Sequence, residues 1–127
     1  MGLFDWLRRT RSSPAAASPR TPPVQDIGPA EAQALQAQGA LIIDVRSQVE
    51  YETYRIPGAR LIPIAQLRRD LSLLPESEVL VFVCEMGGRS ATAAALAAAA
   101  GRTGVYNLAG GMQAWLAAGL PVETSSA

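Results

Sequence analysis

The sequence predicts an α/β domain built on a mostly parallel β-sheet with helices packed against it. Two apolar runs, residues 41–43 and 79–83, are unbroken by polar residues, which is typical of strands covered on both faces. Segments with apolar residues at helical spacing alternate with these runs, as they do in chains that build parallel sheets. The 127 residues, 49% of them hydrophobic, suffice for one core and therefore one domain.

Local signals mark the individual elements. Pro29 and Gly39 stand where helices typically start and stop. Ser47 and Glu50 have the spacing of a capping box, and Pro75 ends a later segment of helical periodicity. The expected helices span residues 29–38, 47–54, 64–74, 90–100 and 112–118. The expected strands lie at 41–46, 61–62, 79–83 and 105–108, with a turn at 56–59.

The first 23 residues differ in composition from the rest. Four arginines against one acid give them a net charge of +3, whereas seven arginines against ten acids give the remainder −3. Residues 10–23 are rich in Ser, Pro, Ala, Thr and Arg and predict a disordered tether. Residues 1–9 predict either a short amphipathic helix in weak contact with a membrane or partner, or a frayed start. The folded domain is expected over residues 24–127.

The amino-acid composition excludes several kinds of site. The chain has no histidine, no lysine and a single cysteine. A Ser-His-Asp or Cys-His triad, a Schiff-base lysine, a P-loop lysine, a histidine-ligated metal and an internal disulfide are therefore excluded. The mildly acidic body argues against nucleic-acid binding. With no long apolar stretch, no signal-peptide core and a lone thiol, we expect a cytoplasmic protein without metal or cofactor.

The candidate nucleophile is Cys84, which follows the most apolar strand at the edge where open α/β sheets bind ligands. Gly87 and Gly88 allow the next loop to turn several N–H groups toward one centre. The helix that starts at Ser90 adds its positive end, and Arg89 adds a positive charge. These effects predict a lowered pKa for Cys84. The alternative, a small buried hydrophobe at a strand end, does not account for this context.

Four ordered stretches carry a family likeness. They are Ile43-Asp44-Val45-Arg46, Glu50-Tyr51 with Ile56-Pro57-Gly58-Ala59, Cys84-Glu85-Met86-Gly87-Gly88-Arg89-Ser90, and Asn107-Leu108-Ala109-Gly110-Gly111-Met112 with Trp115, Gly119 and Pro121. In that order they resemble the "DVR", "E-[YF]…HIPGA", "C-x-x-G-x-R-S" and "L-x-GG…W…G-x-P" motifs of rhodanese-like sulfurtransferases. The likeness covers residues 24–123, and it departs at Arg55, where many relatives have histidine.

The resemblance implies a rhodanese-like fold, with about five strands and helices on both faces, and a persulfide on Cys84. A sulfane sulfur would move from a small donor such as thiosulfate to a thiol or cyanide. The loop implied to bind the donor consists of Glu85, Met86, Gly87, Gly88, Arg89 and Ser90. Asp44 and Arg46 are expected to form an ion pair that supports it. Glu50 is expected to cap a helix, and Trp115 to lie in the core.

Two other functions are weighed against this one. A persulfide carrier or docking module would use the same cysteine to pass sulfur to a partner in a sulfur relay. A cysteine phosphatase or arsenate reductase is disfavoured, because four rather than five residues separate Cys84 from Arg89 and no obvious aspartate serves as the leaving-group acid. We expect Glu85 to point to solvent, and its effect on donor choice is open.

Overall fold

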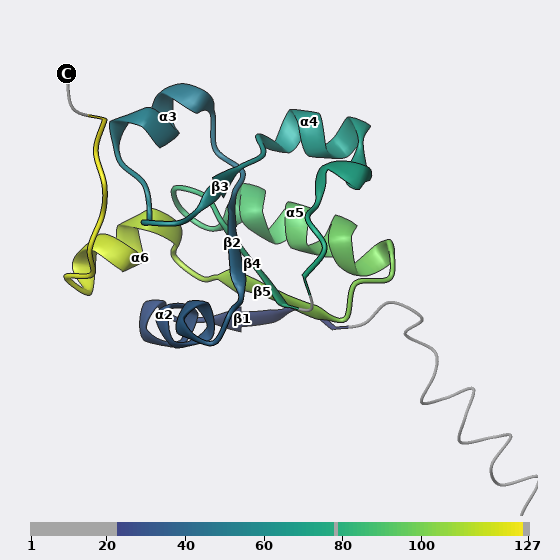
Figure 1. Ribbon diagram of the computed structural model, residues 1–127, viewed down its shortest axis with the longest axis horizontal. Coiled ribbons are helices and arrows are strands. Elements are labelled where there is room, and N and C mark those ends of the chain that lie inside the picture. The colour runs from purple at the N-terminus through teal and green to yellow at the C-terminus, as the bar shows by residue number, and fades with distance from the viewer. Residues whose placement is uncertain (1–22, 78, 126–127) are drawn as a thin grey trace, which may run out of the picture.

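The computed structural model describes residues 23–77 and 79–125, so the expectations for residues 1–22 lie outside the described part of the chain. Its strands form one five-stranded parallel sheet in the order β1-β5-β4-β2-β3 (Figure 1). The strands are β1 (Gln25–Ile27), β2 (Leu41–Asp44), β3 (Arg60–Leu61), β4 (Val79–Val83) and β5 (Gly104–Leu108). The helices are α2 (Pro29–Ala37), α3 (Gln48–Thr53), α4 (Ile64–Arg69), α5 (Gly88–Ala99) and α6 (Gly111–Ala117), with a 3-10 helix η1 (Leu71–Leu73).

The expected α/β fold is confirmed, with local differences at the ends of several elements and one additional strand. Strand β1 was not predicted. Only Ile27 of its three residues is buried, so the segment has no hydrophobic pattern that indicates a strand. The helix expected over 64–74 ends at Arg69, and Asp70 then caps η1 by accepting a hydrogen bond from the Ser72 N–H. Helix α5 starts at Gly88 rather than at residue 90, because Gly87 adopts a left-handed conformation and serves as the N-cap.

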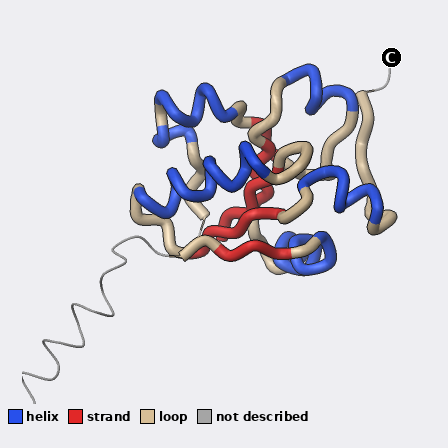
Figure 2. Tube along the Cα trace, turned by 180° about the vertical axis from the view of Figure 1, so that it is seen from behind, coloured by secondary structure: helices blue, strands red, loops and turns tan. Residues whose placement is uncertain are grey.

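Helices cover both faces of the sheet, as Figures 1 and 2 show. Side chains on one face of the strands pack with Leu67 of α4 and Ala93, Ala94 and Ala97 of α5. Those on the other face pack with residues of α2, α3 and α6. Ala93, Ala94, Ala97 and Ala98 of α5 are fully buried, so part of a run that looks like low complexity is a helix face of small residues packed close to the sheet. Trp115 is core, as expected, and its Nε1 donates to the Pro121 carbonyl oxygen at 2.8 Å.

The parallel order brings the carboxyl ends of β2 and β4 side by side, with Asp44 paired to Val83. The chain then leaves β4 through Cys84 into the loop that precedes α5. Helix α6 holds this loop from the neighbouring side, because the Met112 N–H donates to the Cys84 carbonyl oxygen at 2.8 Å. Gly111 permits this close approach: a Cβ there would overlap the Cys84 carbonyl oxygen and the Glu85 backbone.

We predict that Gly111→Ala lowers the free energy of unfolding more than Gly119→Ala does. Both glycines have positive φ, +57° and +72°, so each alanine incurs about 1–2 kcal/mol of left-handed strain. Only Gly111 has backbone atoms where the new methyl group would lie, whereas Gly119 has open space. The additional loss at Gly111 should be about 1–3 kcal/mol, measured by urea unfolding. Equal losses in the two variants would show that α6 does not press on the Cys84 loop.

Candidate functional site

Hydrogen-bond donors converge on the sulfur of Cys84. The backbone N–H of Gly87 lies 3.0 Å from Sγ and that of Ser90 lies 3.3 Å from it, while the Ser90 hydroxyl is 3.2 Å away. Ser90 belongs to the first turn of α5, where backbone N–H groups have no partner within the helix. Its N–H is therefore available to the sulfur. Cys84 is only 1% exposed, so the N–H groups of Gly87 and Ser90 and the Ser90 hydroxyl take the place of water around the sulfur.

The pKa of Cys84 lies below its ordinary value, as predicted. Burial by itself raises this pKa, because it disfavours the thiolate. The Ser90 hydroxyl and the backbone N–H groups of Ser90, Gly87 and Met86 lower it by more, because they bond to the charged form. Cys84 is thus a buried cysteine whose surroundings favour the reactive state.

The hydroxyl of Ser90 has two neighbours and one proton. Besides Sγ of Cys84, it lies 3.2 Å from the carbonyl oxygen of Gly87, to which it donates when the sulfur carries its own proton. When Cys84 is a thiolate, the hydroxyl can turn to the sulfur instead. Ser90 can therefore follow the protonation state of Cys84 by rotation of its hydroxyl alone.

Asp44 and Arg46 form the ion pair expected at the end of β2, and both side chains are buried. Nε and Nη2 of Arg46 donate to the two carboxylate oxygens of Asp44 at 3.0 and 2.8 Å. Nη2 also donates to the carbonyl oxygen of Tyr54 at 2.6 Å, and the guanidinium lies 5.2 Å from the centre of the Tyr54 ring. Burial lowers the pKa of Arg46, but Asp44 and Glu85 raise it above its ordinary value.

The expectation that Glu85 points to solvent is wrong. Its carboxylate accepts hydrogen bonds from Nη1 of Arg46 at 3.2 Å, from the hydroxyl of Tyr54 at 2.6 Å, and from the side-chain amide of Gln113. Asp44 and the Tyr54 carbonyl oxygen leave Nη1 of the buried guanidinium without an acceptor, and Glu85 supplies one. Burial raises the pKa of Glu85, but Tyr54, Gln113 and Arg46 lower it below its usual range.

Arg89 does not bond to the sulfur of Cys84. It forms an ion pair with Glu50. Nη1 and Nη2 of Arg89 donate to the two oxygens of the Glu50 carboxylate at 2.7 and 2.9 Å. Glu50 is also the expected helix cap, since its carboxylate accepts from the Ser47 N–H at 2.9 Å. The Arg89 contact holds the pKa of Glu50 down at about 2, so the carboxylate is ionised at neutral pH.

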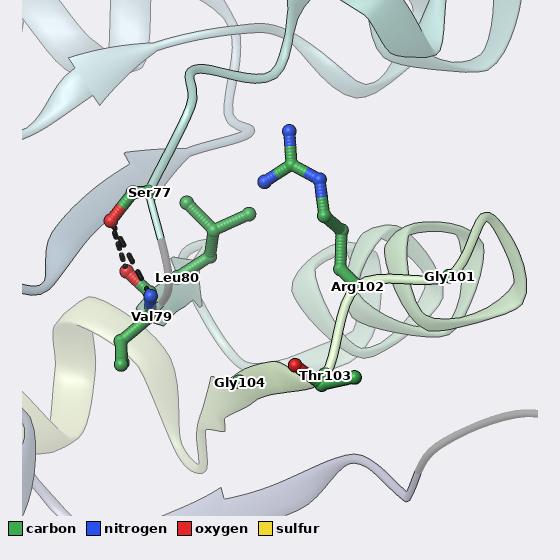
Figure 3. Close-up of a pocket in the computed structure, with 7 residues that line it drawn as sticks. All are labelled: Ser77, Val79, Leu80, Gly101, Arg102, Thr103 and Gly104. Atoms are coloured by element: carbon green, nitrogen blue, oxygen red, sulfur yellow. Dashed lines mark hydrogen bonds between the residues drawn. The ribbon is translucent and has the colours of Figure 1, made fainter.

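One cavity lies away from this site. It has a volume of about 440 Å³ and is lined by Ser77, Leu80, Arg102 and their neighbours at the amino ends of β4 and β5 (Figure 3). A second hollow, of about 240 Å³, adjoins the Cys84 loop. Its lining residues are Arg46, Val49, Glu50, Thr53, Tyr54 and Glu85. Because the cavity in Figure 3 is at the opposite end of the strands, its size says nothing about chemistry at Cys84.

The sequence predicted the loop after β4 and the Asp44–Arg46 pair, and it missed the side-chain contacts of Glu85 and of Arg89. That Cys84 is the nucleophile stays a prediction. The roles of Tyr54 and Gln113 carry no motif, since Tyr54 follows the end of α3 and Gln113 lies on α6, with no sequence signature at either position. The pairing of Glu50 with Arg89 joins residues 39 positions apart, and only the assembled fold brings them together. In the described part of the chain no three His, Cys, Asp or Glu residues cluster as metal ligands, and no helix could span a membrane.

Comparisons with known proteins agree with this fold. The family model of the rhodanese-like domain matches residues 28–118. The human thiosulfate:glutathione sulfurtransferase is 39% identical, over 68% of this chain and 88% of its own length. A thiosulfate sulfurtransferase, GlpE, of Pseudomonas fluorescens is 33% identical, over 79% of this chain and 91% of its own.

A solved structure shows the same architecture. A rhodanese-related protein from Thermoplasma volcanium superimposes with a TM-score of 0.70 at 27% identity, over 78% of this chain and 97% of that one. The family model spans well over half of the sequence and includes all four motifs up to Trp115. The chain belongs to the rhodanese-like domain family.

Proposed function

We propose that the protein is a sulfurtransferase that carries a sulfane sulfur on Cys84. The observation that carries this proposal is the set of three donors, two backbone N–H groups and one hydroxyl, around a buried sulfur of lowered pKa. The names of two relatives, a thiosulfate:glutathione sulfurtransferase and a thiosulfate sulfurtransferase, support the same chemistry. The donor would be a small sulfane compound such as thiosulfate, and the acceptor a thiol or cyanide.

In the first step the Cys84 thiolate attacks the outer sulfur of the donor. A sulfur–sulfur bond forms to Cys84 while the bond within thiosulfate breaks, and sulfite leaves with its electron pair. The product is a Cys84 persulfide, whose outer sulfur carries the negative charge. The N–H groups of the loop from Glu85 to Ser90 would then bind that charge, as they bind the thiolate before reaction.

In the second step an outside nucleophile takes the outer sulfur and restores the thiolate. Cyanide would give thiocyanate, and a thiolate would give a new persulfide, so electrons and charge balance without any redox partner. No histidine is required, because the pKa of Cys84 is already lowered and a general base is not needed to make the thiolate. The chain has no second cysteine, so the acceptor comes from elsewhere.

A carrier that delivers sulfur to a protein partner is the second candidate. Met86, at the tip of the loop, is 69% exposed, and an exposed methionine beside the reacting sulfur suits contact with a protein. A related domain also occurs in a longer adenylyltransferase/sulfurtransferase, MoeZ, of Mycobacterium tuberculosis, 40% identical over 58% of this chain. Slow turnover of thiosulfate with fast uptake from a protein persulfide would favour the carrier over the enzyme.

Initial-rate kinetics test the covalent mechanism. With thiosulfate and cyanide varied together, we expect the parallel double-reciprocal lines of a ping-pong reaction, because the donor leaves before the acceptor reacts. Cys84→Ser should remove all turnover above the uncatalysed rate. Intersecting lines, or turnover that survives in Cys84→Ser, would overturn the proposal.

Substitution of Ser90 should raise the pKa of Cys84. Hydrogen bonds to charged groups contribute about 1.5–3 kcal/mol, so Ser90→Ala should raise this pKa by about one to two units. The ultraviolet absorbance of the thiolate, followed against pH, measures the midpoint directly. Thr92→Val is the matched control, since it removes a hydroxyl from the same helix that contacts only the Gly88 carbonyl oxygen. The same midpoint in both variants would contradict the assignment of Ser90.

A further inference from the structure

Two arginines and three carboxylates surround the Cys84 loop, and they are not evenly matched. Arg46 bonds to both Asp44 and Glu85, so one guanidinium serves two carboxylates. Arg89 is paired with Glu50. These five side chains therefore carry a net charge of −1, which becomes −2 when Cys84 is a thiolate.

Arg89 is the cation in the first turn of α5, directly after the Cys84 loop, and each of its two terminal nitrogens donates to Glu50. The Arg89 side chain is 40% exposed and that of Glu50 is 32% exposed, so the pair stands within reach of solvent and of an incoming donor. An anion that binds both terminal nitrogens of Arg89 in this bidentate way must displace the Glu50 carboxylate. Glu50 is thus in direct competition with an anionic donor for the same guanidinium.

Glu50 is also held in place, so it does not simply swing aside. Its backbone N–H donates to the Ser47 hydroxyl at 3.2 Å, and its carboxylate accepts from the Ser47 N–H. This capping box fixes the first turn of α3 against the loop. Displacement from Arg89 leaves the ionised carboxylate near the bound anion, where like charges repel.

We propose that Glu50, acting through Arg89, sets the charge selectivity of the site and favours monoanionic alkyl persulfides over dianionic thiosulfate as sulfur donors. This inference rests on the proposed function and narrows its donor class. Glu50 is a positioning residue here, because its effect on the donor passes through the guanidinium of Arg89. Compared with dianionic thiosulfate, a monoanionic persulfide is repelled less by the net negative charge of the site. Its binding also depends less on whether Arg89 is released from Glu50.

The test compares Glu50→Gln with Glu52→Gln. Both variants remove one negative charge from α3, but Glu52 is exposed and contacts Gln48 rather than Arg89. Glutamine at position 50 retains an oxygen that can accept from the Ser47 N–H, so the capping box survives. The readouts are KM and kcat with thiosulfate and, separately, with the persulfide of 2-mercaptoethanol.

We expect Glu50→Gln to lower KM for thiosulfate about three- to fivefold with kcat within about twofold, as suits loss of a partly exposed ion pair. KM for the persulfide should fall by a smaller factor, and Glu52→Gln should leave both values at those of the wild type. If Glu50→Gln does not fold, the wild type alone can test the proposal. Added KCl screens the repulsion between the site and an anionic donor, so it should reduce the difference between the KM values for thiosulfate and for the persulfide.

Different results would contradict the proposed function and the role of Glu50. If neither donor adds sulfur to Cys84 in the wild type, the proposed function is wrong. If thiosulfate does load Cys84 but Glu50→Gln and Glu52→Gln have the same KM, or salt leaves the donor preference unchanged, only the role of Glu50 is wrong.

Discussion

A buried sulfur that must carry negative charge is the constraint on which the rest of this structure depends. Cys84 is almost fully enclosed, and burial alone would keep it as a neutral thiol. Hydrogen-bond donors of the backbone offset this effect of burial. Gly87, in a left-handed conformation, turns the loop, and the first turn of α5 directs the Ser90 N–H toward Sγ. Because these groups belong to the main chain, they are fixed before a substrate arrives.

The surrounding charges keep that loop in place. The buried Arg46 links the end of β2 to the loop through Asp44 on one side and Glu85 on the other, and removing one member of such a network commonly costs about 3–5 kcal/mol. The same arrangement leaves little positive charge free for a donor. The site is therefore built to stabilise one sulfur anion, with a supporting shell that resists a second strongly charged group.

The sequence was sufficient for the fold class and for the loop that surrounds Cys84, because each depends on local patterns. Apolar runs marked β2 and β4, and the Gly-Gly-Arg-Ser segment marked the turn into α5. It was insufficient for β1, which pairs at the sheet edge with one buried residue, and for the inward turn of Glu85, which depends on Arg46, 39 positions away. Contacts between residues this distant have no periodicity to reveal them, so they follow only from the assembled sheet.

Intact-protein mass spectrometry tests the central claim most directly. The reduced protein is mixed with thiosulfate and freed of small molecules. Its mass is then measured together with that of a Cys84→Ser sample treated in the same way. The account predicts the added mass of a single sulfur on the wild type, removed by cyanide, and none on the variant. An unchanged wild-type mass with thiosulfate and with an alkyl persulfide, or an equal gain on Cys84→Ser, would contradict it.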